Sequence, residues 1–505
     1  MRNYCLTLTR FIMIKNIKVQ LFFLFACFIF MNSCNKDEGN YDYVEINEVV
    51  FEGLLEDYTV SRFDNLVIST DEVKYTKDTD GTGNYEYSWE AVSDNFLDDN
   101  IYVISTEKDM NQQMLLKPGV YTLFYLVKDL NTDVEFQYQT KLNVVNSIYQ
   151  GWMVLNDVDG EPRLDMISLL DGEYKEVYNV LAGSSLTLTG KPGFVECYPY
   201  QPSFYGVYVS TSGNGTTKLE PDTFDWGKTN NISYEFVSSQ PEDLEVTTLY
   251  PRGNYFSVVM ANSGFYVYNR VNNVYYSTPQ NVRADGISFE VSPHISTSES
   301  FGVFKMVFYD NTNKKFVYHN NYTSNCFDVT STAPVFTPGK DLKYMVWNSY
   351  GGMFGTTFAI LKDPSDGKNY IGMFESNSFT QSHYSEIKAT NFDQAEHIAI
   401  DPTYAYIMYN IGSKVYEYDV FTGTTVEMLD KGGLEITKLE YRKFFKSANA
   451  ELAKQLIVCT YDASGTKGSN GIMELYNVPA IQGQLELNTS FSGFGKIVSV
   501  AYRER

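Results

Sequence analysis

The side chains with which this chain could carry out chemistry stand at none of the spacings that mark the common enzyme sites. The 505 residues contain no GxSxG nucleophile elbow, no glycine-rich phosphate loop and no SxxK pair. The chain has four histidines, and no two of them stand at the HExxH spacing of a zinc enzyme. The sequence therefore indicates neither a serine hydrolase, nor a nucleotide-binding loop, nor a histidine-rich metal site.

The cysteines and the densest acidic turn do not indicate a metal site either. Cys197, Cys326 and Cys459 are widely separated and odd in number, so they offer neither a disulfide framework nor a CxxC metal knuckle. Residues 78–84 have the oxygen density of a calcium loop but lack its twelve-residue spacing and terminal glutamate. We interpret them as a solvated hairpin turn and expect no cofactor and no metal ion.

Paired carboxylates and exposed aromatic rings are the functional arrangements that the sequence leaves open. A glycoside hydrolase needs two acids at a fixed distance in space, and Asp and Glu together number 62. Trp226, Trp347 and Tyr350 stand beside turn residues, the last two just before Gly351 and Gly352. We predict these three rings as contact residues for a sugar or peptide at the mouth of a β-propeller, with packing between its blades as the alternative role.

The candidate functional residues must be positioned by β-strands, because apolar and polar residues alternate along most of the chain. Its 41 tyrosines and 34 phenylalanines alternate with polar residues in runs such as 121–127 and 415–420. Short turn clusters such as Asp159-Gly160 and Thr422-Gly423 separate the runs. A helical pattern is seen at residues 447–456, where we expect a short insertion between strands. The predicted fold class is all-β.

The strand pattern changes near residues 147 to 151, which divides the chain into two parts. Residues 44–147 suit an antiparallel sandwich of the immunoglobulin type, with Trp89 on an alternating strand and therefore in the core. Over residues 148–505, strand clusters recur at roughly the length of a four-stranded propeller blade. We predict a seven-bladed β-propeller there, in which residues 399–425 resemble a blade of the YVTN/NHL kind.

The N-terminus has the pattern of an exported protein. Two lysines precede an apolar run over residues 21–31 that suits a signal peptide and is too short to cross a bilayer as a helix. The run ends in Met-Asn-Ser-Cys, which resembles the lipobox of bacterial lipoproteins. The resemblance implies that residues 1–33 are a signal peptide and that Cys34 carries lipid. An ordinary secretory signal with a chance cysteine is the alternative.

Charge patterns describe the surroundings of the mature chain. Residues 34–43 form an acidic tether, in which Lys36, Asp37 and Glu38 resemble the signal that sends Bacteroidetes lipoproteins to the outer face of the outer membrane. Residues 1–33 hold four basic and no acidic residues, so their removal changes the formal net charge from -23 to -27. So acidic a chain repels nucleic acid, and we expect no nucleic-acid partner.

The end of the predicted sandwich resembles the closing hairpin of PKD domains. Residues 117–145 place Pro118-Gly119 before a strand, apolar residues at alternate positions and Asp129 at the turn. The glycine-aspartate turn that follows the tryptophan of PKD domains is missing after Trp89. With the lipobox and the tether, this arrangement resembles the PKD-like family of Bacteroidetes surface lipoproteins.

The resemblance implies a non-catalytic, lipid-anchored protein of the cell surface. Such a protein would capture a glycan or a peptide beside a TonB-dependent transporter of the starch-utilisation type. A propeller-borne glycoside hydrolase or lyase acting on polysaccharide is the alternative, and an adhesion module is a third. Two carboxylates about 5 to 9.5 Å apart in a polar funnel would favour the enzyme, whereas an open aromatic face would favour binding.

Overall fold

The computed structural model describes residues 46–95, 97–170, 172–198, 206–221, 223–252, 256–270, 272–297, 305–320, 323–352 and 354–504. Strands and turns make up this part of the chain, and its helical segments are 3-10 turns of three or four residues. None of these turns has the length and apolar character that a membrane-crossing helix needs. The all-β prediction is confirmed.

The predicted export features lie outside the described residues. These are the signal peptide over residues 1–33, the tether over 34–43, the lipid site Cys34 and the charges of Lys36, Asp37 and Glu38.

The N-terminal part forms a sandwich, as the alternating pattern predicts. Its strands are β1 (Val49–Val50), β2 (Asp57–Ser61), β3 (Asn65–Ile68), β4 (Lys74–Tyr75), β5 (Tyr85–Ser93), β6 (Ile101–Ser105), β7 (Met110–Gln113), β8 (Gly119–Asp129) and β9 (Val134–Val145). Five strands form one sheet in the order β2-β9-β8-β5-β6, while β3 pairs with β7 and β1 with β4. Trp89 on β5 is 1% exposed and stacks on Tyr125 with ring centroids 4.2 Å apart, so its predicted core position is confirmed.

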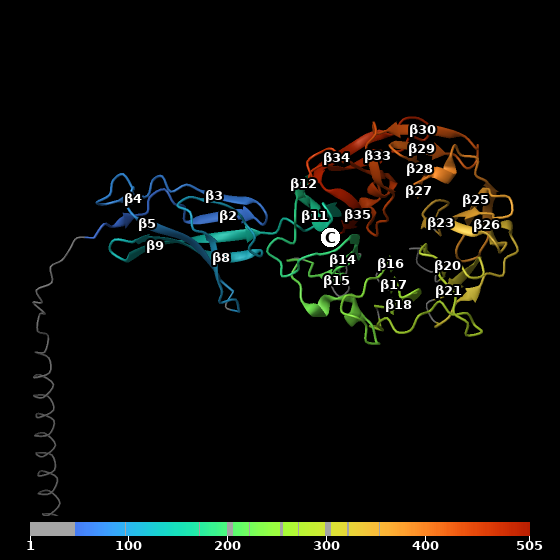
Figure 1. Cartoon of the computed structure of the whole chain (residues 1–505), viewed down its shortest axis with the longest axis horizontal. Coiled ribbons are helices and arrows are strands. Elements are labelled where there is room, and N and C mark those ends of the chain that lie inside the picture. Colours follow the sequence, from blue (N-terminus) through green and yellow to red (C-terminus); the bar gives the residue numbers. More distant parts are fainter. Residues whose placement is uncertain are drawn as a thin grey trace, which may run out of the picture. The chain divides into compact units, whose positions relative to one another are not determined.

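From Gly151 onward the described residues form seven antiparallel sheets, numbered here 1 to 7 in chain order (Figure 1). Sheet 1 contains β10 (Gly151–Val158), β11 (Glu161–Leu170), β12 (Glu173–Val177) and β35 (Lys496–Arg503), sheet 2 contains β13 (Pro192–Cys197), β14 (Val207–Thr211) and β15 (Gly215–Leu219), and sheet 3 contains β16 (Thr248–Arg252), β17 (Phe256–Ala261) and β18 (Gly264–Asn269). Sheet 4 contains β19 (Ser296–Thr297), β20 (Met306–Asp310), β21 (Lys315–His319) and β22 (Phe327–Asp328), and sheet 5 contains β23 (Asp341–Asn348), β24 (Thr356–Lys362), β25 (Asn369–Phe374) and β26 (Gln381–Glu386). Sheet 6 contains β27 (Ile398–Ile400), β28 (Ile407–Ile411), β29 (Lys414–Tyr418) and β30 (Thr425–Asp430), and sheet 7 contains β31 (Glu435–Glu440), β32 (Leu456–Tyr461), β33 (Gly471–Asn477) and β34 (Glu486–Phe494).

The last strand closes these sheets into a propeller. β35 pairs antiparallel with β10, with Gly151 opposite Arg503 and Val154 opposite Val500. Side chains of sheet 1, Trp152 among them, share a hydrophobic cluster with residues of sheet 7. The first and the last sheet of the ring are therefore joined both by backbone pairing and by a common core.

By compactness the chain divides into two units. One unit includes residues 46–53, 70–86 and 127–136, and the other comprises Leu54–Ser69, Tyr87–Leu126 and Gln137–Arg505. The larger unit thus joins the propeller to several sandwich strands.

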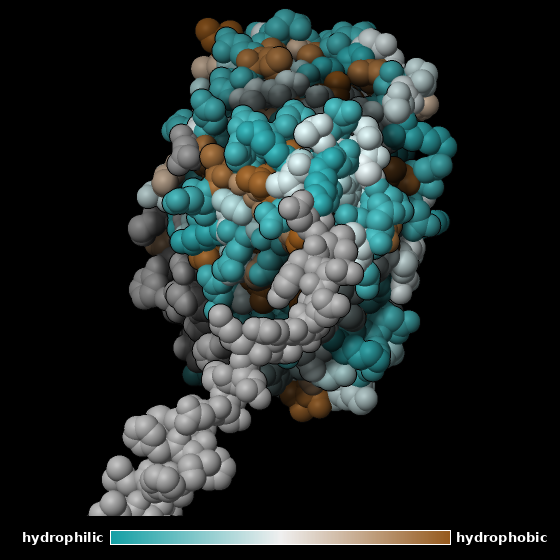
Figure 2. All heavy atoms as spheres, turned by 90° about the vertical axis from the view of Figure 1, so that its left-hand side faces the viewer, coloured by the Kyte–Doolittle hydropathy of each residue, from teal (hydrophilic) through white to brown (hydrophobic). Residues whose placement is uncertain are grey.

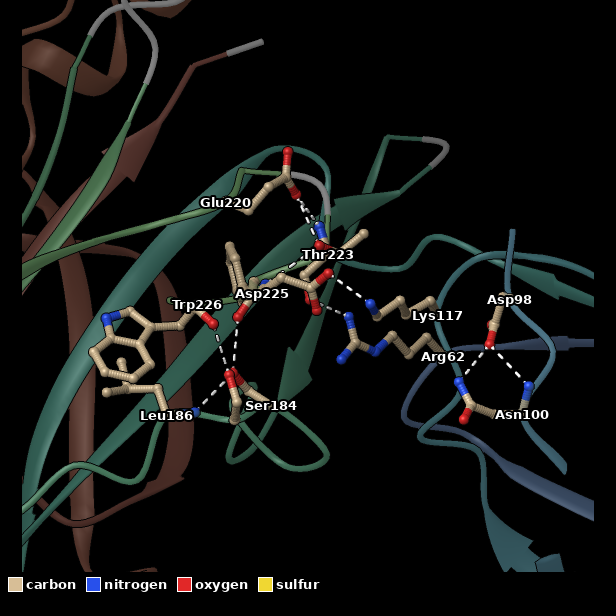
Figure 3. Close-up of polar contacts among 12 residues, drawn as sticks. Arg62, Asp98, Asn100, Lys117, Ser184, Leu186, Glu220, Thr223, Asp225 and Trp226 are labelled. Atoms are coloured by element: carbon tan, nitrogen blue, oxygen red, sulfur yellow. Dashed lines mark hydrogen bonds and ion pairs between the residues drawn. The ribbon is translucent and has the colours of Figure 1, made fainter. Parts of the chain in front are cut away.

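A buried arginine occupies the junction inside this larger unit (Figure 3). Arg62, which follows β2, is 1% exposed, and its Nη1 donates to the carbonyl oxygen of Thr223 at 2.5 Å. An ion pair of 2.7 Å joins Lys117 to Asp225 beside it. Sandwich strands and propeller loops are therefore tied together by polar contacts within one unit.

The insertion in sheet 7 and the acidic turn of the sandwich are both held by local backbone structure. Residues 447–456 form no α-helix but two 3-10 turns, Ser447–Asn449 and Leu452–Lys454, within the expected insertion between β31 and β32. A segment of this length is too short to sustain an isolated α-helix. The turn at residues 78–84 is closed locally, because Asp78 Oδ2 accepts hydrogen bonds from the Gly83 amide and the Tyr85 hydroxyl.

The face seen in Figure 2 is largely hydrophilic with scattered hydrophobic side chains. Across the residues that the structure describes, no group of three or more His, Cys, Asp or Glu side chains is arranged to hold a metal ion. Cys197, Cys326 and Cys459 are buried free thiols.

Candidate ligand-binding cavity

Loops of three consecutive sheets meet at a cavity of about 790 Å³. The lining residues come from segment 349–351 after β23, segment 402–403 after β27 and segment 444–454 after β31. Each segment joins the first strand of its sheet to the second, so all three emerge at the same face of the propeller. A concave site at such a meeting of loops is a usual place for ligand binding.

The sheet 5 segment presents Tyr350. Its backbone amide donates to Asn348 Oδ1 at 3.1 Å, and its carbonyl accepts from Thr356 Oγ1 at 2.8 Å. Gly351 follows with a φ of 84°, a left-handed conformation that favours glycine. The half-buried ring packs edge-on against the buried ring of Phe358, with ring centroids 5.9 Å apart. This contact with the core fixes the ring, while Tyr350 also lines the cavity.

The sheet 6 segment is a turn built around a buried carboxylate. Asp401 is 1% exposed, and its Oδ1 accepts from the Thr403 amide at 2.9 Å and from the Tyr404 amide. Burial raises the pKa of Asp401, and these backbone hydrogen bonds oppose the shift. The Asp401 carboxylate therefore stabilises the turn and does not line the cavity. The residues of this turn that line the cavity are Pro402 and Thr403.

The sheet 7 segment is held by the end of the chain. Glu504 is 3% exposed, and its carboxylate accepts from the amides of Phe445 and Lys446 at 2.7 and 2.8 Å and from Asn449 Nδ2 at 2.8 Å. Phe444 packs edge-on against Trp152, with centroids 5.9 Å apart. These contacts fix an aromatic pair and a lysine at the cavity.

The chemical character of the lining follows from these segments. It combines the rings of Tyr350, Phe444 and Phe445 with hydroxyl groups and with the ammonium groups of Lys446 and Lys454. No aspartate or glutamate belongs to the lining that the structure describes. Such a surface can stack against flat apolar faces and can donate hydrogen bonds, but it lacks the pair of carboxylates that glycoside hydrolysis needs.

An ion pair joins Glu196 on β13 of sheet 2 to Arg442 in the segment that follows β31. Arg442 Nη2 donates to both oxygens of Glu196 at 2.8 Å. Burial raises the pKa of Glu196, and the charge of Arg442 opposes the shift. The pair leaves neither group available as a free acid or base.

Of the three rings predicted to contact a ligand, Tyr350 lies at this cavity. Trp347 is 6% exposed on β23 and donates from Nε1 to the Phe354 carbonyl at 3.0 Å, so the expectation of an exposed ring is wrong for it. Trp226 is half-buried, packs against the core cluster of sheets 1 and 2 and donates to Thr217 Oγ1 at 2.7 Å. The structure therefore does not assemble the three rings into one platform.

The sequence patterns do not predict four residues of the lining, which are Phe444, Phe445, Lys446 and Lys454. One signal could have found them, because they lie in and just before the insertion that the sequence analysis expected between two strands of sheet 7. Insertions on a rigid scaffold often carry binding residues.

The N-terminal part of the chain is similar to a known protein family. Residues 34–192 match the PKD-like family, in agreement with the resemblance seen in the sequence. The match extends beyond the sandwich through the strands β10 to β12. No curated protein matches this chain.

Several solved structures are similar at low identity. A quinonprotein alcohol dehydrogenase-like protein from Bacteroides thetaiotaomicron has 12% identity over 90% of this chain and 95% of its own, with a TM-score of 0.46. The extracellular domain of a one-component system from the same organism has 9% identity over 62% of this chain and 36% of its own, with a TM-score of 0.37. YCF48 from Cyanidioschyzon merolae has 11% identity over 65% and 98%, with a TM-score of 0.36.

Proposed function

We propose that this protein is a lipid-anchored outer-membrane protein of the cell surface that binds a nutrient polymer without turning it over. The observation that carries the proposal is the lining of the cavity, in which rings, hydroxyl groups and ammonium groups occur without a carboxylate of a described residue. Asp401 and Glu504, two acids that hold the lining segments, are 1% and 3% exposed and are engaged by backbone amides. Rings and polar groups of this kind suffice for binding a ligand, whereas glycoside hydrolysis also needs two carboxylates in the site.

The N-terminal sequence supports the proposed setting. The PKD-like family match begins at residue 34, which is the cysteine that we propose as the lipid attachment site. Lys36, Asp37 and Glu38 would direct the anchored chain to the cell surface, beside a TonB-dependent transporter of the starch-utilisation type. The polymer would be a glycan or a peptide that the transporter complex imports. A glycoside hydrolase or lyase is the less supported alternative, because its acid pair is missing from the described lining.

The test uses the Cys34→Ala chain, which would be recovered in soluble form. Immobilised protein is incubated with a panel of host and plant glycans and with peptide digests, and both retention and product formation are followed. We expect retention without products, and we expect Phe445→Ala to weaken retention by about tenfold, because it removes a ring of the lining. Phe421→Ala is the matched control, since Phe421 is 56% exposed but does not line the cavity. Release of oligosaccharides or peptide fragments at enzymatic rates would overturn the proposal.

A further inference from the structure

We infer that one edge of the sandwich binds an extended segment of another protein, in which apolar side chains are flanked by lysine or arginine. The surface is formed by residues 101–104 of β6 and residues 112–117 at and after the end of β7, and is called the β6 surface below. It shares no lining residue with the cavity at sheets 5 to 7, so the inference is independent of the proposed function.

The β6 surface surrounds a cavity of about 510 Å³. Besides the two segments that define the surface, the lining includes Tyr121 of β8 and Gly183 of the propeller. Three apolar side chains of the lining are exposed, because Ile101, Val103 and Leu115 have 64%, 60% and 37% of their surface in water. Exposed apolar side chains around a cavity are typical of a surface that a partner covers.

The backbone of β6 explains why the partner segment should be extended. β6 is the last strand in the order β2-β9-β8-β5-β6, so no described strand is hydrogen-bonded to its outer edge. It contains neither the lysine nor the proline that often block a free edge. The register with β5 is regular over residues 101–103 and shifts before Ser105, so the edge suits a short segment. Such a segment can pair with the free backbone groups by strand addition, while its side chains contact the lining.

The charges beside β6 determine which segment fits. Residues 98–100 before the strand hold two acids, and residues 106–109 after it hold two acids and one base. Hydrogen bonds from Tyr102 and Asn100 hold the pKa of Asp98 below its usual range, so this carboxylate is charged at neutral pH. Both ends of β6 are therefore negative, and they favour a segment with basic flanks.

The same charges disfavour a second copy of this chain as the partner. Antiparallel pairing of β6 with itself would place each acidic flank beside an acidic flank of the other copy, and the whole chain has a formal net charge of -23. The charged side chain of the described lining is Lys117, which pairs with Asp225 at 2.7 Å (Figure 3). This lysine therefore does not reverse the sign of the surface.

The test measures peptide binding to the Cys34→Ala chain by fluorescence anisotropy. The probe is a labelled synthetic peptide with the sequence Lys-Lys-Thr-Val-Thr-Val-Thr-Lys-Lys. One comparison peptide has glutamate in place of each lysine, and the other has methylated backbone nitrogens at alternate residues, which removes the donors for strand pairing. We expect the lysine peptide to bind about tenfold tighter or more than either comparison peptide. Its affinity should fall as salt rises.

Two double variants of the protein locate the peptide. Ile101→Lys with Val103→Lys should weaken binding of the lysine peptide by about tenfold or more, because it blocks the edge with charges of the same sign. Ile101→Thr with Val103→Thr keeps the charge and should weaken binding by about five- to tenfold, because apolar contact is lost. Val145→Lys is the control, since Val145 is 43% exposed on β9, an inner strand of the same sheet.

An unchanged melting temperature would show that the variants remain folded. Equal binding of the lysine and glutamate peptides, absence of binding, or binding that neither double variant weakens would overturn the inference. A dimer of the Cys34→Ala chain in sedimentation that the lysine variant abolishes would replace the partner segment by a second copy. Retention of glycans or peptide digests in the panel of the proposed function should be the same in both double variants, so the two proposals can fail separately.

Discussion

Trp89 shows how one side chain can hold the sandwich together. Its ring is 1% exposed, stacks on Tyr125 and donates from Nε1 to the Lys108 carbonyl at 3.3 Å. Trp89→Ala should lower the free energy of unfolding by about 3 to 5 kcal/mol, because a large buried aromatic leaves a cavity. Urea unfolding measures the loss. Val67→Ala, at a position 66% exposed on the same sandwich, should change stability by less than about 0.5 kcal/mol. A Trp89 indole that soluble quenchers reach in the folded protein would contradict this prediction.

Glu417 is a buried acid whose charge should make stability depend on pH. It is fully buried on β29, and burial raises its pKa to about 7, with Asp401 and Asp419 adding repulsion and Gln482 opposing the shift. Because the folded-state pKa is raised, the folded protein holds the proton more tightly than the unfolded chain. The associated stability is fully present below about pH 4.5 and is lost as pH rises through about 7.

Glu417→Gln removes this ionisation while keeping the shape of the side chain. Relative to the unchanged protein, the variant should therefore gain up to about 3 kcal/mol in the free energy of unfolding at pH 8 and much less at pH 5. Urea midpoints at the two pH values measure the difference. Glu427→Gln on the neighbouring β30 is the control, because that side chain is 41% exposed and pairs with Lys414. The same gain at both pH values for Glu417→Gln would show that ionisation is not the cause.

At the scale of elements, the insertion between β31 and β32 depends on a distant carboxylate. Its two 3-10 turns have no side-chain caps, and Glu504 instead accepts hydrogen bonds from the amides just before them. Glu504 directly follows β35, the strand that closes the ring. Closure of the propeller therefore also places the acceptor that orders the cavity-lining segment.

Glu504→Gln should loosen this segment without opening the propeller. The NH₂ group of glutamine is a donor and cannot accept from the backbone amides that the Glu504 carboxylate binds. The substitution should therefore destabilise the segment by about 1.5 to 3 kcal/mol, the usual contribution of a hydrogen bond to a charged group. We expect hydrogen exchange over residues 441–455 to become roughly tenfold faster or more, and ligand affinity to fall. Exchange in β10 and β35 should stay unchanged. Glu451→Gln is the control on the same insertion, because its side chain is 84% exposed. Unaltered exchange in the Glu504→Gln protein would contradict the positioning role.

At the scale of the whole molecule, a strongly acidic chain is expected to be fixed to a membrane by one lipid-bearing residue. If Cys34 carries the lipid, Cys34→Ala should release the protein into the soluble fraction, because acyl chains supply the membrane affinity. Neutralising Lys36, Asp37 and Glu38 together should leave the protein anchored but protected from protease added to intact cells. Membrane fractionation and surface proteolysis measure the two effects. Surface proteolysis that is unchanged by the triple substitution would refute the export role of these charges.

The local features of this protein can be predicted from its amino-acid sequence. Alternation and turn clusters predict strands because the period of two and the positive φ at turns are properties of neighbouring residues. The spacing of strand clusters likewise predicted sheet-sized units, and the described residues contain seven sheets from Gly151 onward. Trp89 could be assigned to the core because its alternating strand allows only an inward or an outward direction.

The choice of loops that share a site, and of rings that are buried, depends on long-range packing. Segments 349–351, 402–403 and 444–454 meet because ring closure by β35 and the stacking of sheets 5 to 7 bring distant residues together, and no local pattern encodes that meeting. Trp347 stands close to the turn that presents Tyr350, yet a Cβ atom at Gly355 would lie 2.5 Å from its ring, so the returning backbone covers it. Local sequence could place both rings beside a turn, but burial depends on what the rest of the chain packs against them.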